Sequence, residues 1–251
     1  MSVLRQQRRG PVALLTLNRP ERRNALSLEL LAHLKTAFAQ VAAGDATVVV
    51  VTGADPAFCA GLDLHELAGS TRSLEGEGVI SAMRAVPQPL IAAVNGACVT
   101  GGLELALNCD VRIASERASF ADTHTRVGVH PGWGMSAILP RLVGSGWARH
   151  LSLTADYIDA TTALRAGLVT RVVAHAELLA AAMSMAASIA AADQPVLRAY
   201  KRLYDEDGAL LAALRRERAG FEEHRRGLDA GAVAARVDGV IAHGRSAQRG
   251  G

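Results

Sequence analysis

The stretch GACVTGGLELALNCD, residues 96–110, sets adjacent glycines and a single glutamate inside an otherwise apolar run. Its spacing predicts a helix with Leu103 and Ala106 or Leu107 on one side and Glu104 in the first turn. A helix N-terminus carries unpaired N–H groups and about half a positive charge. The glycines let a ligand oxygen approach these groups, so TGGLE is predicted to hold an anion. From spacing alone, Glu104 is either an acid or base at that site or only a complement to the helix dipole.

Short apolar runs on both sides of this stretch indicate an α/β fold. PVALLTLN, TVVVVTG, LIAAV and VRIAS each predict a strand, and the second and third are apolar enough to be buried on both faces. Ser27 is the predicted N-cap of a helix that ends at Gly44. An apolar stripe runs along that helix, through Leu30, Leu34, Phe38 and Val41.

The remaining segments are predicted more coarsely. Residues 54–69 form a loop that leads to a second helical stretch ending near VPQP, and residues 116–134 form a loop rich in glycine, histidine and proline. From Tyr157 onward the pattern is mostly helical, and the spacing in the last third shows no chemistry. We expect a core over residues 1–195 and a helical region over residues 196–251.

Composition restricts the class of protein. The chain has 251 residues, half of them apolar, and a formal net charge of +3, with basic residues scattered rather than in one block. This argues against nucleic-acid binding but suits a phosphate-bearing ligand. No export signal is evident, and the apolar run LLAAAMSMAASIAAA is shorter than the roughly 18 residues a membrane helix needs. Cys59, Cys98 and Cys109 lack metal-ligand spacing, so we expect reduced, buried thiols and a cytoplasmic location.

A second anion cradle is predicted in FCAGLDL. Gly61 permits an unusual backbone angle there, and the N–H of Leu62 is then able to point inward. Two converging N–H donors form an oxyanion hole, in which loss of one donor costs on the order of a hundred- to a thousandfold in rate. Glu104, one helical turn from Gly101, would lie beside the developing charge.

Several blocks in one order resemble the enoyl-CoA hydratase/isomerase, or crotonase, superfamily. The blocks are AFCAGLDLHEL, PLIAAVNGACVTGGLELALNCDVRIASERASF, GVHPGWG and ATTALRAGLVTRVV. The resemblance runs from about Val12 to Val173 and more loosely through the helical tail. It implies a spiral of ββα units and a helical C-terminal region that packs homotrimers, often dimers of trimers. It also implies a coenzyme A thioester as substrate, with no further cofactor and no metal.

The resemblance assigns roles to individual residues. The N–H groups of Leu62 and Gly101 are implied to hold the thioester oxygen as an enolate forms. Glu104 falls on the first of the two catalytic glutamates of the hydratase pattern. The implied substrate contacts come from Arg23, Ala25, Ala60, Leu62, Asp63, Leu64, His65, Gly101, Gly102, Pro131 and Trp133.

The chain departs from the pattern at the second catalytic glutamate. His124 stands there, within FADTHTRVG. Histidine carries protons near neutral pH, so a Glu104/His124 pair is chemically credible. Alternatively His124 is a loop residue, or Asp122 acts in its place with a shorter side chain. We favour His124 because it occupies the matching position.

The leading hypothesis is reversible hydration of a 2-enoyl-CoA to the 3-hydroxyacyl-CoA through an enolate held in the oxyanion hole. One alternative keeps the ligand and changes the reaction to double-bond isomerisation, thioester hydrolysis or decarboxylation. Another is an acyl-CoA-binding member without catalysis. The sequence leaves open the acyl-chain length of the substrate and whether the assembly is a trimer or a hexamer.

Overall fold

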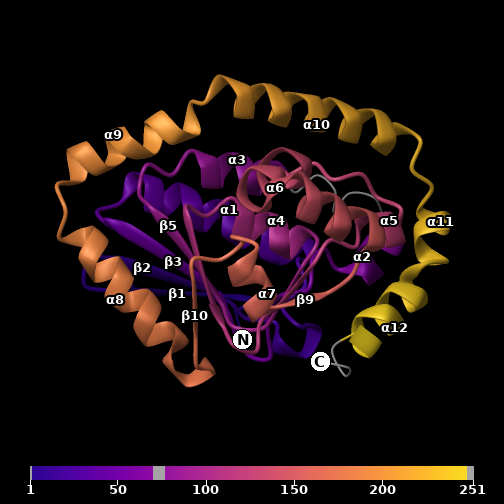
Figure 1. The fold of residues 1–251 in the computed structure, drawn as a ribbon, viewed down its shortest axis with the longest axis horizontal. Helices are drawn as coiled ribbons and strands as arrows, with labels where there is room; N and C mark the ends of the chain where they lie inside the picture. Colours follow the sequence, from indigo (N-terminus) through magenta and orange to yellow (C-terminus); the bar gives the residue numbers. More distant parts are fainter. Residues whose placement is uncertain (1, 70–76, 248–251) are drawn as a thin grey trace.

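The larger of two β-sheets in this computed structural model has the strand order β1-β2-β3-β5-β7-β10 (Figure 1). The structure describes residues 2–69 and 77–247. The strands are β1 (Leu4–Arg9), β2 (Val12–Leu17), β3 (Val48–Gly53), β5 (Leu90–Val94), β7 (Val111–Ser115) and β10 (Arg171–Val173). β1 pairs antiparallel with β2, and the other neighbours pair parallel. β5 is buried along its whole length, as expected of a parallel strand covered on both faces.

The smaller sheet has the order β4-β6-β8-β9. Its strands are β4 (Ala57–Cys59), β6 (Ala97–Val99), β8 (Ser119–Ala121) and β9 (Ile158–Asp159). β4, β6 and β8 pair parallel, and each follows a strand of the larger sheet along the chain. A helix comes after each pair, so the chain winds through successive ββα units, and the predicted spiral fold is confirmed.

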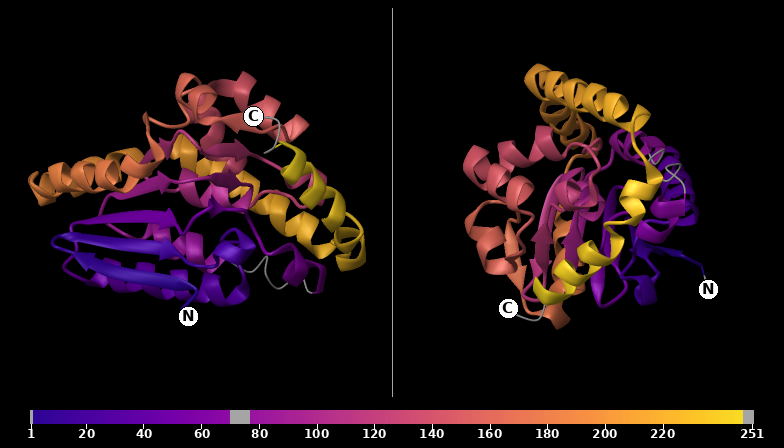
Figure 2. Two further views of the ribbon diagram at one scale, coloured as in Figure 1. Left: turned by 90° about the horizontal axis from the view of Figure 1, so that it is seen from below. Right: turned by 90° about the vertical axis from the view of Figure 1, so that its right-hand side faces the viewer.

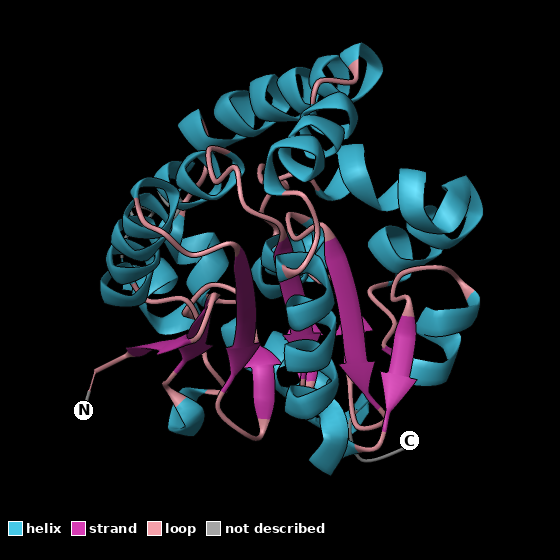
Figure 3. Ribbon diagram, turned by 90° about the vertical axis from the view of Figure 1, so that its left-hand side faces the viewer, coloured by secondary structure: helices cyan, strands magenta, loops and turns pink. Residues whose placement is uncertain are grey.

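Helices cover both faces of the larger sheet (Figures 2 and 3). On one face, α8 (Leu178–Ala190) buries Leu178, Ala182 and Ala186 against apolar side chains of β2, β3, β5 and β7. On the other face lie α1 (Leu28–Ala43) and α3 (Glu77–Arg84), in the main apolar core. The other elements up to α8 are η1 (Pro20–Arg22), α2 (Leu64–Gly69), α4 (Gly101–Leu107), α5 (His124–Val127), α6 (Met135–Thr154), α7 (Ala160–Arg165) and η3 (His175–Glu177).

The last helices form an arc around the core (Figure 1). They are α9 (Gln194–Asp205), α10 (Gly208–Arg226), α11 (Ala230–Ala234) and α12 (Val237–Ala247). α9 buries no residue, whereas α10 packs along α6 and buries Glu217 and Phe221. α11 and α12 then return to α2, on the side of the molecule where β4 ends. The tail therefore reaches the region in which the smaller sheet delivers its loops.

Several sequence predictions are confirmed and others are wrong. The Ser27 hydroxyl accepts a hydrogen bond from Leu30 N at 3.2 Å, and the helix ends before Gly44 as predicted. The predicted strands at β2, β3, β5 and β7 are present. The expected loop over residues 116–134 instead contains β8 and α5, and β9 and β10 interrupt the region expected to be helical. Strands of two or three residues are too short to show an alternating pattern. The division at residue 195 stays a prediction.

Within the described residues, no single helix is both long and apolar enough to cross a membrane. Two consecutive helical segments, His175–Ala190 and Gln194–Asp205, meet that test only as a pair, and they are bent by 109°.

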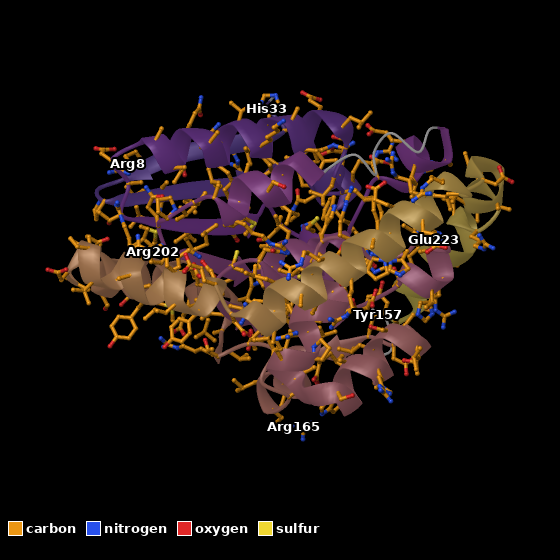
Figure 4. All side chains as sticks on the ribbon, turned by 90° about the horizontal axis from the view of Figure 1, so that it is seen from above. Arg8, His33, Tyr157, Arg165, Arg202 and Glu223 are labelled. Carbon is orange, nitrogen blue, oxygen red and sulfur yellow. The ribbon has the colours of Figure 1, made fainter. Side chains whose placement is uncertain are left out.

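Replacing Phe38 tests how much the α1 stripe contributes to stability. Phe38 is fully buried, so Phe38→Ala removes a large apolar side chain and leaves a cavity. We expect a loss of about 3–5 kcal/mol in the free energy of unfolding, measured by urea denaturation. His33, on the exposed side of the same helix, provides the control (Figure 4), and His33→Ala should change stability by about 0.5 kcal/mol or less. Equal losses for the two variants would contradict the assigned core face.

Candidate active site

A cavity of about 290 Å³ lies where the carboxyl ends of β4, β6 and β8 meet. These strands are neighbours in one parallel sheet, with Cys59 beside Cys98 and Val99 beside Ala121. The segments that follow them supply Leu62, Gly101 and His124 to the cavity wall. Parallel strands bring their carboxyl ends to one edge of a sheet, which is where ligands bind in open α/β sheets. The fold therefore gathers at one place three segments that lie far apart in the sequence.

The backbone around Leu62 directs its N–H toward this cavity. On one side of Leu62, Leu26 N donates to Gly61 O at 2.8 Å, and on the other, Asp63 N donates to Leu26 O at 3.1 Å. Amide groups in an extended segment alternate in direction, so the Leu62 N–H points away from Leu26. Leu62 itself lines the cavity.

The second donor is the N–H of Gly101, the first residue of α4, which has no partner within its helix. A Cβ at Gly101 would lie 3.6 Å from Leu62 N, so the two N–H groups are close together. Gly61 has a φ of +95°, and a Cβ there would lie 3.0 Å from Val99 O. Only glycine fits this position without strain, which explains the glycine in the predicted cradle.

Thr100 holds the turn between β6 and α4. Its φ is +52°, a positive value that a β-branched residue rarely adopts. Thr100 N donates to Ala121 O at 2.9 Å, and Thr123 N donates to the Thr100 hydroxyl at 3.0 Å. The two threonine hydroxyls are 2.5 Å apart. Strained backbone held by surrounding bonds is typical of functional sites.

Glu104 projects from α4 into the base of the cavity and is 2% exposed. Its Oε1 accepts hydrogen bonds from Trp133 N at 2.9 Å and from Met135 N at 3.3 Å. Its Oε2 lies 3.6 Å from His124 Nε2. A buried carboxylate requires such partners, since an unpaired buried charge is costly. One carboxylate oxygen is thus fixed by the backbone and the other faces the histidine.

His124 lies between two carboxylates. Its Nδ1 is 2.6 Å from Asp122 Oδ1, and its Nε2 faces Glu104. Burial disfavours a charge on the ring, but the hydrogen bonds and negative charges of Asp122 and Glu104 outweigh burial and raise the pKa of His124 to about 10. The ring is therefore an imidazolium at neutral pH, with both nitrogens able to donate.

Asp122 lies on the far side of His124 from Glu104. Burial raises the pKa of Asp122, but its hydrogen bond to His124 and the charge of that ring outweigh burial and lower it below 3.8. Asp122 is absent from the side chains that line the described part of the cavity. It therefore fixes the ring of His124 rather than standing in for it as the group that faces the cavity.

The structure brings most of the predicted binding residues to this cavity. The wall includes Arg23, Ala25, Ala60, Leu62, Asp63, Leu64, His65, Gly101 and Trp133, besides Glu104 and His124. The Asp63 carboxylate pairs with Arg19 at 3.0 Å and accepts from His65 N, so it shapes this wall. Gly102 and Pro131 do not line the cavity. Gly102 packs against the Cys59 backbone, where a Cβ would lie 2.2 Å from the carbonyl oxygen, and the Pro131 carbonyl faces His130 Nδ1.

The C-terminal tail supplies cavity residues that the sequence analysis missed. Phe221 of α10 lines the wall, as do Val240, Ile241, Gly244 and Arg245 of α12, and Val240 packs against the apolar cluster that contains Phe221. Arg22, next to the predicted Arg23, lines the cavity as well. The tail contacts follow from the path of α10 to α12 around the core, and nothing in the spacing of those amphipathic helices indicates a site.

A hydrogen-bonded series of a serine, a histidine and an aspartate lies elsewhere in the fold. Ser115 Oγ is 3.0 Å from His175 Nδ1, and His175 Nε2 is 3.2 Å from Asp55 Oδ2. Ser115 is fully buried and also accepts from Arg117 N, so it is not a nucleophile that a substrate reaches. This series joins the ends of β3, β7 and β10 instead.

The cysteines and the metal-ligating residue types do not form a further site. All three cysteines are buried, and burial raises the pKa of Cys59 and of Cys109 to about 12, so their thiols stay protonated. Among residues 2–69 and 77–247, no group of three or more His, Cys, Asp or Glu side chains is arranged to hold a metal ion.

The chain is similar to known proteins in both sequence and structure. The sequence profile described as enoyl-CoA hydratase/isomerase matches residues 7–224. The solved structure of an enoyl-CoA hydratase from Mycobacterium tuberculosis H37Rv is 50% identical, with a TM-score of 0.80 over 90% of this chain and 100% of that one. A crotonyl-CoA hydratase of Syntrophomonas wolfei is 38% identical over 203 residues, which cover 78% of each chain. The probable peroxisomal enoyl-CoA hydratase 1 of Arabidopsis thaliana is 35% identical over 202 residues, 78% of this chain and 76% of that one.

The charge on His124 is testable by NMR. The imidazole resonances of His124 should titrate at about 10, far above the ordinary 6.5. Asp122→Asn removes one of the two neighbouring negative charges and should move this titration toward 6.5. Asp156→Asn, which alters an exposed partner of His150, is the control and should leave His124 unchanged. A His124 ring that titrates near 6.5 in the unmodified protein would overturn the assigned charge state.

Proposed function

Because the chain belongs to the enoyl-CoA hydratase/isomerase family, we propose that it hydrates 2-enoyl-CoA thioesters reversibly to 3-hydroxyacyl-CoA. The resemblance noted in the sequence is thereby confirmed. The observation that carries the proposal is the Glu104/His124 pair facing the same cavity as the N–H groups of Leu62 and Gly101. Polarisation of a thioester and transfer of two protons at its double bond need this combination of groups.

The first part of the reaction uses the oxyanion donors and Glu104. The thioester oxygen accepts hydrogen bonds from the N–H groups of Leu62 and Gly101, which makes the β-carbon electrophilic. Glu104 Oε1 is fixed by Trp133 N and Met135 N, so Oε2, which faces His124, is the oxygen that acts on the water. Oε2 takes a proton from water as the water oxygen bonds to the β-carbon, and the electrons of the double bond move into the enolate.

The second part uses the imidazolium of His124. Its Nε2–H donates a proton to the α-carbon as the enolate collapses to the thioester. Glu104 then holds the proton from water, and His124 has lost one. Their facing atoms are 3.6 Å apart, so a small closure returns the proton from Oε2 to Nε2. The net change is addition of one water, with both side chains restored.

The mouth and depth of the cavity suit a coenzyme A thioester. Arg22, Arg23 and Arg245 line the cavity, and their charges suit the phosphates of such a ligand. Apolar side chains of α2, α5 and α10 also line the cavity and form one cluster, which includes Leu67, Val127 and Phe221. This combination suits a charged carrier and an apolar acyl chain.

We further propose a cytoplasmic homo-oligomer, a trimer or a dimer of trimers. The support lies on α9, where four apolar side chains on adjacent turns are exposed: Val196, Tyr200, Leu203 and Tyr204. Large apolar patches of this kind mark interaction sites in soluble proteins. Lys201, on another side of the helix, pairs with Asp110 and fixes α9 to the core, which leaves the apolar side facing outward.

Hydration of crotonyl-CoA, followed by loss of enoyl absorbance, tests the proposed reaction. Glu104→Ala and His124→Ala should each reduce kcat by about 10²–10⁴-fold, because each removes a proton carrier. His124→Glu should retain activity, since it restores a two-carboxylate pair. The unmodified enzyme should lose activity as pH rises through about 10, where His124 loses its proton, and His124→Glu should lack this alkaline limb.

The outcome separates the alternatives. If the unmodified protein does not hydrate crotonyl-CoA but isomerises a 3-enoyl-CoA, its reaction is isomerisation and not hydration. A protein that binds coenzyme A thioesters with no turnover, and no effect of Glu104→Ala, would be a binding protein. His150→Ala, at an exposed histidine outside the cavity wall, serves as the matched control and should keep full activity.

The α9 surface is tested by the mass of the assembly in light scattering. Leu203→Asp with Tyr204→Asp places two charges on the exposed apolar side and should lower the mass toward that of a monomer. Arg202→Ala, on the same helix (Figure 4), should leave the mass unchanged. A monomeric unmodified chain, or an assembly that survives the double substitution, would rule out this surface as the interface.

A further inference from the structure

The turn that leads into α6 is held by two carboxylates that come from distant parts of the chain. Four consecutive backbone N–H groups, of residues 133–136, donate alternately to them. Those of Trp133 and Met135 donate to Glu104 Oε1. Those of Gly134 and Ser136 donate to Glu217, at 2.5 Å and 2.6 Å. The N–H groups at the start of a helix lack partners in that helix, and here two acidic side chains satisfy them in alternation.

The conformation of Gly134 makes this alternation feasible. Its φ is +116°, which favours glycine, so the chain turns sharply between Trp133 and Met135. The Ser136 hydroxyl adds a further hydrogen bond to Glu217 Oε2 at 2.5 Å. Glu217 therefore fixes the turn at one end through Gly134 and at the other through Ser136.

Glu217 has no direct contact with the cavity. It is 5% exposed and lies outside the side chains that form the described cavity wall. Phe221, one turn further along α10, packs against Gly132 at the start of the same segment, where a Cβ would lie 2.7 Å from the ring. α10 thus contacts the turn at both ends, and the mechanical link from Glu217 to the cavity runs through the backbone of this turn.

The two carboxylates also interact through their charges. Burial and the charge of Glu104 raise the pKa of Glu217, and the bonds from Ser136 and Gly134 oppose that rise. Arg84 lies beside the turn, donating from Nη2 to Trp133 O at 3.2 Å, and its charge acts on both carboxylates. Two buried acids at one turn are costly unless donors and a nearby cation compensate them, as the four N–H groups and Arg84 do here.

We propose that Glu217 is a positioning residue for Glu104: by fixing the turn at residues 132–136, it sets the N–H groups that hold Oε1 and so aims Oε2 at the reacting water. The inference rests on the proposed hydration. Displacement of a catalytic group by about 1 Å can cost on the order of 10²-fold in rate, so this turn has a large effect on kcat. The helical tail contributes to the reaction as well as to the cavity wall.

Glu217→Gln is the principal test, with Glu223→Gln as the matched control on the same helix (Figure 4). Glutamine keeps the size of the side chain, but it directs an NH₂ group at an N–H donor and disrupts the alternation. We expect kcat for crotonyl-CoA to fall about 10- to 100-fold, with KM changed less than about twofold because most of the cavity wall lies outside this turn. Glu223 is exposed, and its variant should match the unmodified enzyme.

A double-mutant cycle distinguishes positioning from a general loss of structure. In a Glu104→Gln background, Glu217→Gln should lower the residual rate no further, because the group it positions has gone. An equal fold-loss in both backgrounds would overturn the proposal, as would unchanged kcat in Glu217→Gln. If Glu217→Gln does not fold, Ser136→Ala provides the test. A kcat lowered about threefold at constant KM supports the proposal, and an unchanged kcat overturns it.

A readout without activity separates this inference from the proposed function. The chain has two tryptophans, so Trp147→Phe leaves Trp133 in the turn as the single tryptophan. Adding Glu217→Gln should shift its emission, whereas adding Glu223→Gln should not. If the unmodified enzyme does not hydrate crotonyl-CoA but Glu217→Gln still shifts the emission, only the proposed hydration is refuted. If the enzyme is active and Glu217→Gln causes neither the shift nor a loss of rate, the role of Glu217 is refuted.

Discussion

The buried carboxylate of Glu104 is the constraint on which the site depends. A charge at 2% exposure is tolerated only if the surrounding structure supplies donors, and each of its oxygens has a separate set of partners. The backbone of the turn before α6 holds Oε1, and His124 faces Oε2. The position of α4, the conformation of that turn and the end of β8 are therefore linked, since moving any one of them would leave a buried charge without its partner.

The ββα winding explains how these segments meet. The three parallel strands of the smaller sheet are each only three residues long, so they contribute little area of their own. Their role is to position the loops, because the pairing of neighbouring strands brings Gly61, Thr100 and Asp122 to one edge of the sheet. Each strand is anchored by the longer, almost wholly buried strand that precedes it. A rigid larger sheet thus positions short segments whose own cohesion is weak.

The sequence predicts the longer elements and the cradle but not the network around them. Local sequence signals predict these elements: Ser27 and Gly44 bound α1 as expected, and the β-branched run forms β3. The TGGLE and FCAGLDL motifs predict donors because glycine permits backbone angles that other residues avoid. Glu217 and Phe221 lie in an ordinary amphipathic helix, and only the path of the tail around the core brings them to the site. Contacts of this kind depend on tertiary arrangement, which periodicity does not record.

The histidine at position 124 becomes intelligible once Asp122 is considered with it. Two carboxylates that share one water cannot both ionise in a buried site, so a glutamate pair would carry one negative charge and one transferable proton. Here Glu104 and Asp122 supply two negative charges and the imidazolium supplies one positive charge, which again leaves one net negative charge and one transferable proton. A histidine alone would have left a neutral pair with Glu104, so the local charge is preserved only because Asp122 bonds the far side of the ring. The change from carboxylic acid to imidazolium is thus a change of proton carrier at constant charge, and the reaction that the cavity supports can stay the same.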